Sequence, residues 1–516
     1  MDTRLHKIGL RAMVTLMISL GLVSIAQAEL KLASFFCDHL VLQQGVPLDV
    51  WGTGEAGKAV ELRFAGQTVR TRVAESGSWR IQLRPLAANA QGEDLHISDG
   101  QTQRVVHDVV VGEVWLAAGQ SNMQMMVRAM VKKLPETAIL VNDANTPGIR
   151  FLRIDEAVGG GRRLDFQKPP AWKLCRPETV RAFSAVAWIF ARRLHEDLDV
   201  PVGVIDVSWG GKPIEPFIPG EAFAGHPLLQ QIKKLADQKQ LDALAKLKGG
   251  VIIRNPEGYP GAIYDSRMRP LEGCGLRGFL WYQAESNCGK GEDPRGYRHK
   301  MQVLAGSWRQ AWDDPDLPLY FVQLPKYKEE AGGWIRMREE QRRSLAIAHT
   351  GMAVTIDTGS DDVHPANKVD VGERLALLAL HRSYQRPVVD SGPLYQSHRI
   401  EEGLVTVSFT HADSGLMVAR KTGLQEPREI GGAKVPYFEL AGEDGVWFTA
   451  QAHIDGNEVC VSSPQVARPQ VVRYACLNNP QEGLLYNRDG LPASPFCSDL
   501  AGLPWTEEDS QGKAAQ

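Results

Sequence analysis

One serine and one histidine in this sequence lie in settings that suit the transfer of an acyl group. Ser121 follows an apolar run over residues 109–118, in the order Gly119-Gln-Ser-Asn-Met123. A serine hydroxyl is a weak nucleophile without a base, and histidine is the usual base near neutral pH. His364, in Ser360-Asp-Asp-Val-His-Pro365, is the candidate base. Taken alone, Ser121 is more simply explained as a helix N-cap, for which serine is a preferred residue.

Two aspartates precede the candidate base. Asp361 lies three residues before His364 and Asp362 lies two before it. A carboxylate at such spacing can hold the tautomer of the imidazole and stabilise the imidazolium. Acidic residues before a helix are more often caps or solvated loop residues, and a calcium site built from the two aspartates is a further alternative.

The tetrahedral intermediate of acyl transfer needs hydrogen-bond donors for its oxyanion. The N–H of Ser121 is one candidate. Gly210-Gly211, which follows the apolar run over residues 201–207, lets the backbone approach closely and offers a second N–H. A third donor must come from Gln283-Ala-Glu-Ser-Asn287, which follows the apolar run over residues 278–283. A plain turn explains Gly210-Gly211 when that pair is considered by itself.

The elements that must position these residues are long apolar strands alternating with helices, between about residues 108 and 385. Besides the three runs named above, residues 319–324 and 352–356 read as strands, and helical periodicity covers residues 183–194 and about 368–382. Such alternation predicts a parallel sheet with helices on both faces. The strands' carboxyl ends then meet at one rim, where all the candidate residues would gather. Residues 218–262 form a helical insertion in this pattern.

The flanking regions have the alternation of half-buried antiparallel strands. Val60, Leu62 and Phe64 alternate with polar residues near one end, and Val405, Val407 and Phe409 do so near the other. We therefore predict an N-terminal β-sandwich over residues 29–107 and a C-terminal β-rich region over residues 386–503. The polar residues 504–516 should form a flexible tail.

The first 28 residues have the layout of a secretory signal peptide. A basic head with Arg4, Lys7 and Arg11 precedes an apolar core over residues 12–25 and a small-x-small site at Ala26-Gln-Ala28. The core is shorter than the ~20 apolar residues of a membrane-spanning helix. We expect cleavage near Ala28 and a secreted or periplasmic protein.

Composition bounds the class of protein. A chain of 516 residues is too long for one ordinary domain, and 43% hydrophobic with 23% charged residues is typical of a globular protein. The net charge of −3 offers no electrostatic basis for binding nucleic acid or an anionic membrane. The seven cysteines leave at least one unpaired within the chain; Cys476 and Cys497 are plausible partners, but the sequence fixes neither their pairing nor the oligomeric state.

The four motifs together resemble the sialate O-acetylesterase family of the SGNH hydrolases, which includes bacterial acetylesterases of plant polysaccharides. The resemblance rests on Gly-Glu-Val-Trp-Leu-Ala-Ala-Gly-Gln-Ser-Asn-Met (112–123), Ser-Trp-Gly-Gly-Lys-Pro-Ile-Glu (208–215), Phe-Leu-Trp-Tyr-Gln-Ala-Glu-Ser-Asn (279–287) and Asp-Val-His-Pro-Ala-Asn-Lys (362–368). It implies an α/β fold of SGNH type, with a flavodoxin-like parallel sheet flanked by helices, between N-terminal and C-terminal β-sandwich regions.

The resemblance also implies roles for single residues. Ser121 would be the nucleophile and His364 the general base, with Gly211 and a side chain of the third motif as oxyanion donors. The sequence departs from the family at Ala284, where glycine is usual, and at Lys212, where threonine is usual. A Cβ at position 284 restricts the backbone there, so we favour Gln283 as the donor and keep Asn287 as second choice.

The resemblance leaves the triad acid open. The SGNH spacing Asp-x-x-His points to Asp361, whereas this family often has its aspartate two residues before the histidine, as Asp362 is here. We favour Asp361 slightly. A Ser–His dyad is the alternative if neither carboxylate contacts His364.

The function that follows is the removal of acetyl groups from a glycan, either a hemicellulose such as xyloglucan or xylan, or an O-acetyl sialic acid. No metal or organic cofactor is required. Five aromatic residues near the motifs could offer platforms for sugars: Trp209, Phe217, Trp281, Tyr282 and Tyr327. Two alternatives are an inactive carbohydrate-binding protein and a lipase or esterase of other acyl esters. The G-x-S-x-G elbow of many lipases is absent, since Met123 stands where its second glycine would be.

Overall fold

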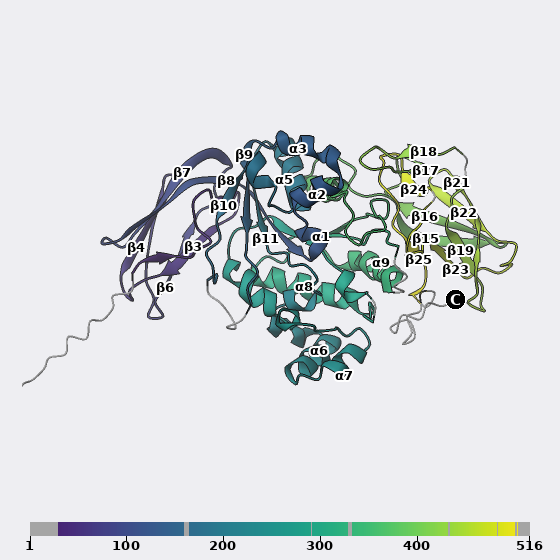
Figure 1. The fold of residues 1–516 in the computed structure, drawn as a ribbon, viewed down its shortest axis with the longest axis horizontal. Coiled ribbons are helices and arrows are strands. Elements are labelled where there is room, and N and C mark those ends of the chain that lie inside the picture. The colour runs from purple at the N-terminus through teal and green to yellow at the C-terminus, as the bar shows by residue number, and fades with distance from the viewer. Residues whose placement is uncertain are drawn as a thin grey trace, which may run out of the picture.

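The computed structural model describes residues 29–158, 165–289, 291–328, 333–431, 434–481, 483–500 and 503. The predicted signal peptide, residues 1–28, and the predicted tail, residues 504–516, lie outside the described residues. Along its longest axis the molecule places a β region first, a mixed α/β region in the middle and a second β region last (Figure 1).

The middle region is built on a sheet whose central strands are all parallel. In spatial order these strands are β9 (Thr146–Arg153), β11 (Val202–Asp206), β8 (Gln103–Gly119), β12 (Gly278–Tyr282), β13 (Leu319–Val322) and β14 (Thr350–Ala353). The five apolar runs predicted as strands are confirmed. Numbered along the chain, those five follow the order 2-1-3-4-5, with the parallel strand β9 beyond the second of them. Strand β9 and the antiparallel edge strand β10 (Trp172–Cys175) were not predicted.

Helices cover both faces of this sheet, as the buried runs predicted. Along β8, Trp115 and Ala117 belong to one hydrophobic core, while Leu116 and Ala118 belong to the other. Successive side chains of a strand point to opposite faces, so each core covers one face. On the first face lie α5 (Ala185–Leu198) and α10 (Val369–Arg382); on the second lie α8 (Tyr297–Ala311) and α9 (Gly333–Arg343).

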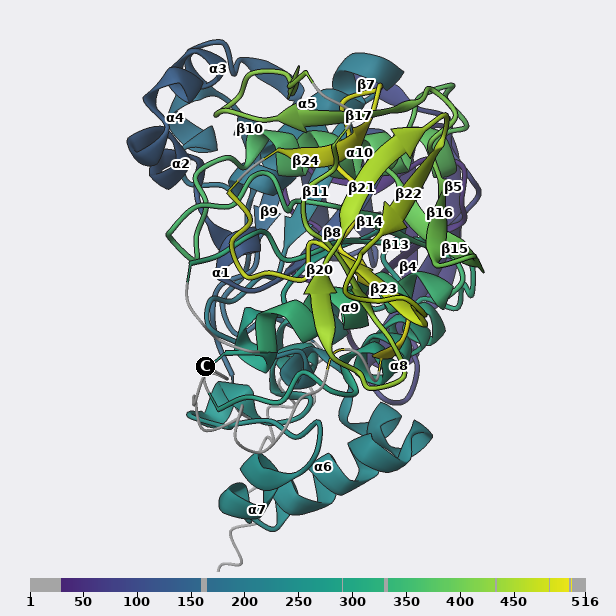
Figure 2. The same ribbon diagram turned by 90° about the vertical axis from the view of Figure 1, so that its right-hand side faces the viewer.

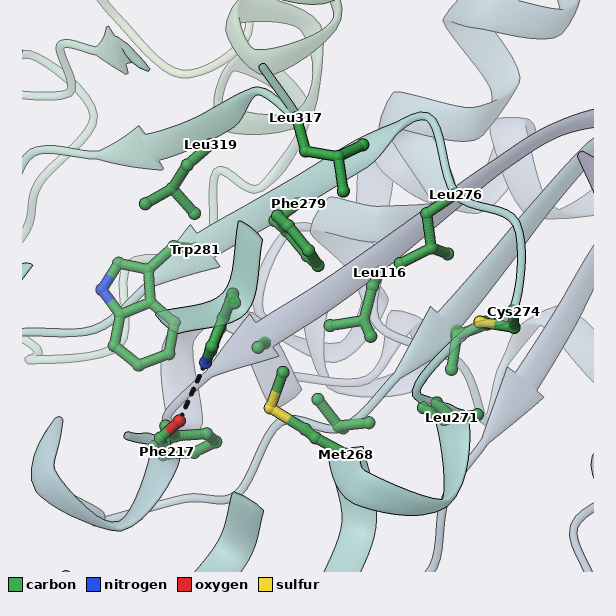
Figure 3. Packing of buried hydrophobic residues seen from close by; sticks show 14 of the residues in the cluster. Leu116, Phe217, Met268, Leu271, Cys274, Leu276, Phe279, Trp281, Leu317 and Leu319 are labelled. Atoms are coloured by element: carbon green, nitrogen blue, oxygen red, sulfur yellow. Dashed lines mark hydrogen bonds between the residues drawn. The ribbon is translucent and has the colours of Figure 1, made fainter. Parts of the chain in front are cut away.

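The second core also holds the segment that follows the second motif. Leu116, Phe279 and Trp281 project from neighbouring strands toward Met268 and Phe217, as Figure 3 shows. The carbonyl of Phe217 accepts a hydrogen bond of 2.9 Å from the indole N–H of Trp308, dashed in Figure 3. The chain after Gly211 is therefore anchored to the sheet and to α8.

Four short helices lie in the connections between β8 and β9 and between β10 and α5. They are α1 (Ser121–Gln124), α2 (Val127–Lys133), α3 (Ala138–Asn142) and α4 (Pro177–Val180). The predicted insertion over residues 218–262 contains α6 (Pro227–Asp237) and α7 (Leu241–Lys246), which project from the middle region in both ribbon views (Figures 1 and 2). No helix in the described ranges is long and apolar enough to cross a membrane.

The N-terminal β region shares a strand with the middle region. One small sheet consists of β1 (Lys31–Leu32), β3 (Leu48–Thr53) and β6 (Ser78–Leu83), and a second group consists of β2 (Val41–Gln43), β4 (Ala59–Phe64), β5 (Gln67–Arg72) and β7 (Asn89–Ser98). Strand β8 pairs with β7 and β2 in its first half and with β11 and β12 in its second. The border placed between residues 107 and 108 therefore falls inside one continuous strand.

The C-terminal region consists of three small sheets. Their orders are β15-β16-β22-β21, β18-β17-β24 and β20-β19-β23-β25. The strands are β15 (Leu394–Glu401), β16 (Leu404–Thr410), β17 (Leu416–Arg420), β18 (Arg428–Glu429), β19 (Phe438–Ala441), β20 (Trp447–Thr449), β21 (Gln451–Asp455), β22 (Glu458–Ser462), β23 (Val471–Tyr474), β24 (Leu484–Asn487) and β25 (Phe496–Cys497). All seven cysteines are free thiols; Cys476 and Cys497 are buried in one small cluster without a bridge.

Candidate active site

Ser121 lies directly after the most central strand of the sheet. At Gly119 a Cβ would stand 2.1 Å from the carbonyl oxygen of Tyr282, and φ is +135°, so only glycine lets β8 pack against β12 here. The N–H of Gln120 donates to that same carbonyl at 2.9 Å. Helix α1 then begins at Ser121, and its N-cap is Gln120 rather than the serine. The N-cap explanation of Ser121 therefore does not hold.

Ser121 and His364 meet across the rim. The Oγ atom of Ser121 lies 2.7 Å from Nε2 of His364, although 243 positions separate the two residues. His364 comes from the loop between β14 and α10, and its side chain is 34% exposed. A half-buried serine hydroxyl in hydrogen-bond contact with an imidazole is the arrangement that activates a serine nucleophile.

The two aspartates before His364 have different partners. Oδ1 of Asp362 accepts the backbone N–H of His364 at 2.9 Å and lies 3.7 Å from its Nδ1. Asp361 instead pairs with Lys328, at 3.3 Å. The geometry favours Asp362 over Asp361, the reverse of the preference drawn from the Asp-x-x-His spacing, because the turn at residues 360–364 directs only the second carboxylate back toward the histidine.

A lysine from α2 binds the loop that carries His364. Lys133, at the end of α2, contacts Oδ2 of Asp362 and donates to the carbonyl of His364 at 3.1 Å. Each aspartate thus has a lysine partner. Within the part of the chain that the structure describes, no three His, Cys, Asp or Glu residues are placed to hold a metal ion, so the calcium alternative gains no support.

Electrostatics keep the candidate base neutral. Burial lowers the pKa of His364 below its usual value, and the positive charges of Lys368 and Lys133 lower it further, against the opposing effect of Asp362. The hydrogen bond from Lys133 holds the pKa of Asp362 below its usual range, with help from the N–H of His364. His364 can therefore accept a proton at mildly acidic pH, while Asp362 stays ionised.

The two glycines of the second motif lie beside Ser121. The N–H of Trp209 donates to the carbonyl of Gly119, and that of Gly210 donates to Oε1 of Gln124, at 2.9 and 2.8 Å. A Cβ on Gly210 would stand 3.5 Å from Cβ of Ser121. Gly211 has φ of +67° and is exposed, and a Cβ on it would meet no atom of the described chain within 4 Å. The motif therefore brings the backbone close to the serine and leaves an open side at Gly211.

Gln283 and Asn287 lie in a buried hydrogen-bond network. The hydroxyl of Tyr297 donates to Oε1 of Gln283 at 2.7 Å, which fixes the orientation of that amide. Nε2 of Gln283 then donates to Oε1 of Gln120, the carbonyl of Lys212 and Oδ1 of Asn287, at 3.0, 3.2 and 2.9 Å. Both side chains are almost fully buried, at 0% and 2% exposure.

Asn287 extends this network away from the serine. Its Nδ2 donates to the carboxylate of Glu215 at 3.1 and 3.3 Å, and Glu215 forms a buried ion pair with Lys300. The amide N–H groups of Gln283 and Asn287 thus already have acceptors, and a direct bond to an oxyanion would require one of these bonds to break. Neither residue was predicted as a partner of Asn287: Glu215 is the last residue of the second motif, and Lys300 lies outside all four motifs.

The departures at positions 284 and 212 fit the structure. Ala284 has φ of 166° and ψ of −20°, and it directly precedes the short turn over Glu285–Asn287. The side chain of Lys212 turns away from Gly211, donating to Oδ1 of Asn255 at 3.2 Å and lying 5.4 Å from the ring centre of Trp209. Of the five aromatic candidates, Phe217, Trp281 and Tyr282 are buried in the cores, whereas Trp209 and Tyr327 are partly exposed.

Three further polar residues at the rim escaped the sequence analysis. Asn122, Glu285 and Lys368 are buried together beneath Ser121 and His364, joined through the amide of Asn122. All three belong to the motifs themselves: Asn122 follows Ser121, Glu285 lies two residues after Gln283, and Lys368 lies four residues after His364. Their presence within those motifs was the only available signal, because burial of a charged residue is not visible in a sequence.

Comparison with known proteins gives one consistent result. Residues 111–381 match the model of a family described as carbohydrate esterase, sialic acid-specific acetylesterase. The sialate O-acetylesterase of Mus musculus is 25% identical over 522 residues, covering 91% of this chain and 94% of that protein. The enzyme of that name from Homo sapiens is 27% identical, covering 73% and 76%. The crystal structure of a carbohydrate acetylesterase from Xanthomonas citri superposes with a TM-score of 0.79 at 30% identity, covering 91% of this chain and all of that one.

Proposed function

Because the chain belongs to the sialic acid-specific acetylesterase family of carbohydrate esterases, and is therefore an esterase, we propose that it hydrolyses acetyl esters on a glycan through Ser121 and His364. The observation that carries the proposal is the 2.7 Å contact between Oγ of Ser121 and Nε2 of His364 at the carboxyl rim of the sheet. The strand order of the sheet supports an SGNH-type hydrolase.

The reaction proceeds in two halves. Oγ of Ser121 attacks the acetyl carbonyl carbon while Nε2 of His364 accepts the hydroxyl proton. The resulting imidazolium gives this proton to the sugar oxygen as the ester C–O bond breaks, leaving an acetyl group on the serine. Water then attacks the acetyl carbon, with His364 accepting its proton and returning it to Oγ, so that acetate leaves and the serine is regenerated.

The oxyanion of each tetrahedral intermediate is stabilised by backbone N–H groups of Ser121 and Gly211. Support comes from the packing of Gly210 on Ser121 and from the open side at Gly211. Gln283 and Asn287 support this oxyanion site indirectly. Gln283 donates a hydrogen bond to the side chain of Gln120, the residue before the nucleophile, and another to Asn287. Asp362 acts as the acid of the triad, with Lys133 holding its carboxylate toward the histidine loop.

We assign the substrate to the acetylated glycans, either a hemicellulose or an O-acetyl sialic acid. Trp209 lies beside Gly210 and is partly exposed, so its ring can pack against a sugar. Tyr327, which forms a bridge with Ser360 near the histidine loop, can do the same from the other side. The N-terminal sequence supports export from the cytoplasm before the enzyme meets its substrate.

Acetate release by the purified mature chain tests the proposal. The panel consists of acetylated xyloglucan, acetylated xylan, O-acetyl sialic acid and a small aryl acetate, each with Ser121→Ala in parallel. Release from one glycan, with a loss of several orders of magnitude in the variant, would establish the mechanism and identify the substrate.

Three other outcomes would redirect the assignment. Glycan binding without acetate release from any of the four substrates would identify an inactive carbohydrate-binding protein. Turnover of long-chain aryl esters in preference to the acetate would identify a lipase, and undiminished acetate release by Ser121→Ala would exclude this serine as the nucleophile.

A further inference from the structure

A charged residue lies fully buried beneath the Ser121–His364 pair. Lys368 is 0% exposed and directly precedes α10, four positions after His364. Asn122, also 0% exposed, follows Ser121 in the chain, and Glu285, 7% exposed, lies in the loop after β12. The mechanism above uses none of these three residues, and burial of charge is costly unless the charge is paired.

The amide of Asn122 joins the group in one defined orientation. An ammonium can only donate, so the atom that faces Nζ of Lys368 is Oδ1 of Asn122. Nδ2 then faces two acceptors, Oε1 of Glu285 at 2.5 Å and the carbonyl of Val363 at 2.9 Å. Glu285 is held in turn by the N–H of Ala284, at 3.0 Å.

This amide connects the two segments that carry the nucleophile and the base. Asn122 is the residue after Ser121, and Val363 is the residue before His364. The bond from Nδ2 to the carbonyl of Val363 therefore fixes the backbone of the histidine loop relative to α1. Lys368 and Glu285 hold the amide from both sides, so the distance between Ser121 and His364 depends on all three residues.

The charge of Lys368 also acts on the imidazole. The positive charges of Lys368 and Lys133 oppose protonation of His364, and the negative charge of Asp362 favours it. Around Lys368 lie the anions Glu285 and Asp362, the cation Lys133 and the ring of Tyr282, with Nζ 5.3 Å from the ring centre. Burial lowers the pKa of Lys368 to about 7, so the ammonium carries its charge over the acidic range in which His364 titrates.

We propose that Lys368 is a positioning residue for the esterase reaction: it orients Asn122 so that the loop of His364 stays in place, and its buried charge disfavours a second positive charge on the imidazole. The proposal rests on the function assigned to Ser121 and His364. It differs from a purely structural role, because a residue that only supported the fold would leave the titration of His364 unchanged.

Three substitutions separate the charge from the hydrogen bond. Lys368→Arg keeps both, Lys368→Gln keeps a donor for Oδ1 of Asn122 but removes the charge, and Lys368→Met removes both. Lys421→Met is the matched control, because Lys421 is nearly buried and pairs with Asp370 on α10. All variants are checked by circular dichroism and thermal unfolding before kinetics.

The first measurement is the pH dependence of kcat/KM for an aryl acetate. Removal of the charge in the Gln and Met variants should move the acidic limb to higher pH by about one unit, while the Arg and control variants keep the limb of the parent. The Met variant should also lose kcat on its plateau, since the loop is no longer held. If Lys368→Met fails to fold, the comparison of the Gln and Arg variants decides the question.

The second measurement does not depend on turnover. The Cε1–H signal of His364, identified by its loss in His364→Gln, is titrated by NMR in the parent and in Lys368→Gln. A raised midpoint in the variant supports the proposal even if no tested ester is a substrate. Equal midpoints, or a loss of kcat/KM that is the same at every pH, would overturn it. Retained activity in Ser121→Ala would instead remove the proposed function.

Discussion

The carboxylate of Asp362 holds His364 through the backbone more closely than through the ring. Its Oδ1 accepts the N–H of His364 at 2.9 Å, whereas Nδ1 of the same residue lies 3.7 Å away, beyond hydrogen-bond length. The side chains of Asp362 and His364 are partly exposed, at 50% and 34%. The acid of this site therefore acts mainly by fixing the loop and by its charge in the resting enzyme.

This geometry predicts unequal roles for the two neighbouring aspartates. Asp362→Asn should lower kcat/KM by about ten- to a hundredfold, less than the ~10⁴-fold cost of losing a fully engaged triad acid. Asp361→Asn should change it by less than about twofold, because Asp361 pairs with Lys328 on the surface and exposed pairs contribute little. Steady-state kinetics on an aryl acetate compare the two, and a larger effect of Asp361→Asn would reverse the assignment.

The pH profile should have its acidic limb below the ordinary histidine value. A general base must be neutral, and burial with two nearby lysines lowers the pKa of His364 below 6.5. As pH falls, kcat/KM should therefore decline as His364 becomes protonated, with the midpoint of the decline below pH 6.5. A limb above pH 7 would contradict this account.

The second motif should tolerate a methyl group differently at its two glycines. At Gly210 a Cβ would stand 2.9 Å from Oε1 of Gln124 but in ordinary contact, at 3.5 Å, with Cβ of Ser121, so Gly210→Ala should push aside the Gln124 side chain that accepts the Gly210 N–H and lower kcat through the backbone beside the nucleophile. At Gly211 the space is open but φ is +67°, so Gly211→Ala should cost about 1 kcal/mol in backbone strain. Measuring kcat and the free energy of unfolding for both variants tests this difference. Equal losses of kcat in the two variants would contradict it.

The buried ion pair behind the site should contribute strongly to folding. Glu215→Gln leaves Lys300 charged and without its partner at 1% exposure, which should lower the free energy of unfolding by about 3–5 kcal/mol. The control is Asp237→Asn, which breaks the exposed pair with Lys233 on α6 and should cost less than about 0.5 kcal/mol. Urea unfolding measures both, and similar costs would show that the pair at Glu215 is not essential.

Sequence patterns predicted the elements whose signal is local. The strands that end at Ala118, Val207 and Gln283 are long apolar runs, and β8, β11 and β12 cover them, although their limits differ by a few residues. Strand β9 was missed because it contains Pro147 and Arg150, and the charge of Arg150 is paired with Asp108, from another part of the chain. That pairing depends on the tertiary fold, which periodicity does not report.

The sequence indicated that Ser121 and His364 would meet at the rim, but not the contacts around them. Family membership bears out the resemblance drawn from the four motifs. The spacing before His364 could not decide between two adjacent aspartates, because a turn determines which one points back. Nor could it show that the amide of Asn287 donates to Glu215, a residue 72 positions away. Trp281 was predicted as a candidate sugar platform, but its side chain lies in a core. The sequence does not show whether an aromatic residue on a buried strand faces a core or a ligand.

Strand β8 has a consequence for how this protein can be divided. The family match begins at residue 111, inside a strand that runs from residue 103 to residue 119. A chain trimmed to the matched segment would start in mid-strand and lack β2 and β7, which would leave the first residues of β8, Val111 and Gly112, without the strands they pair with. The N-terminal β region and the middle region should therefore be kept together when the protein is truncated for expression or recombined with its relatives.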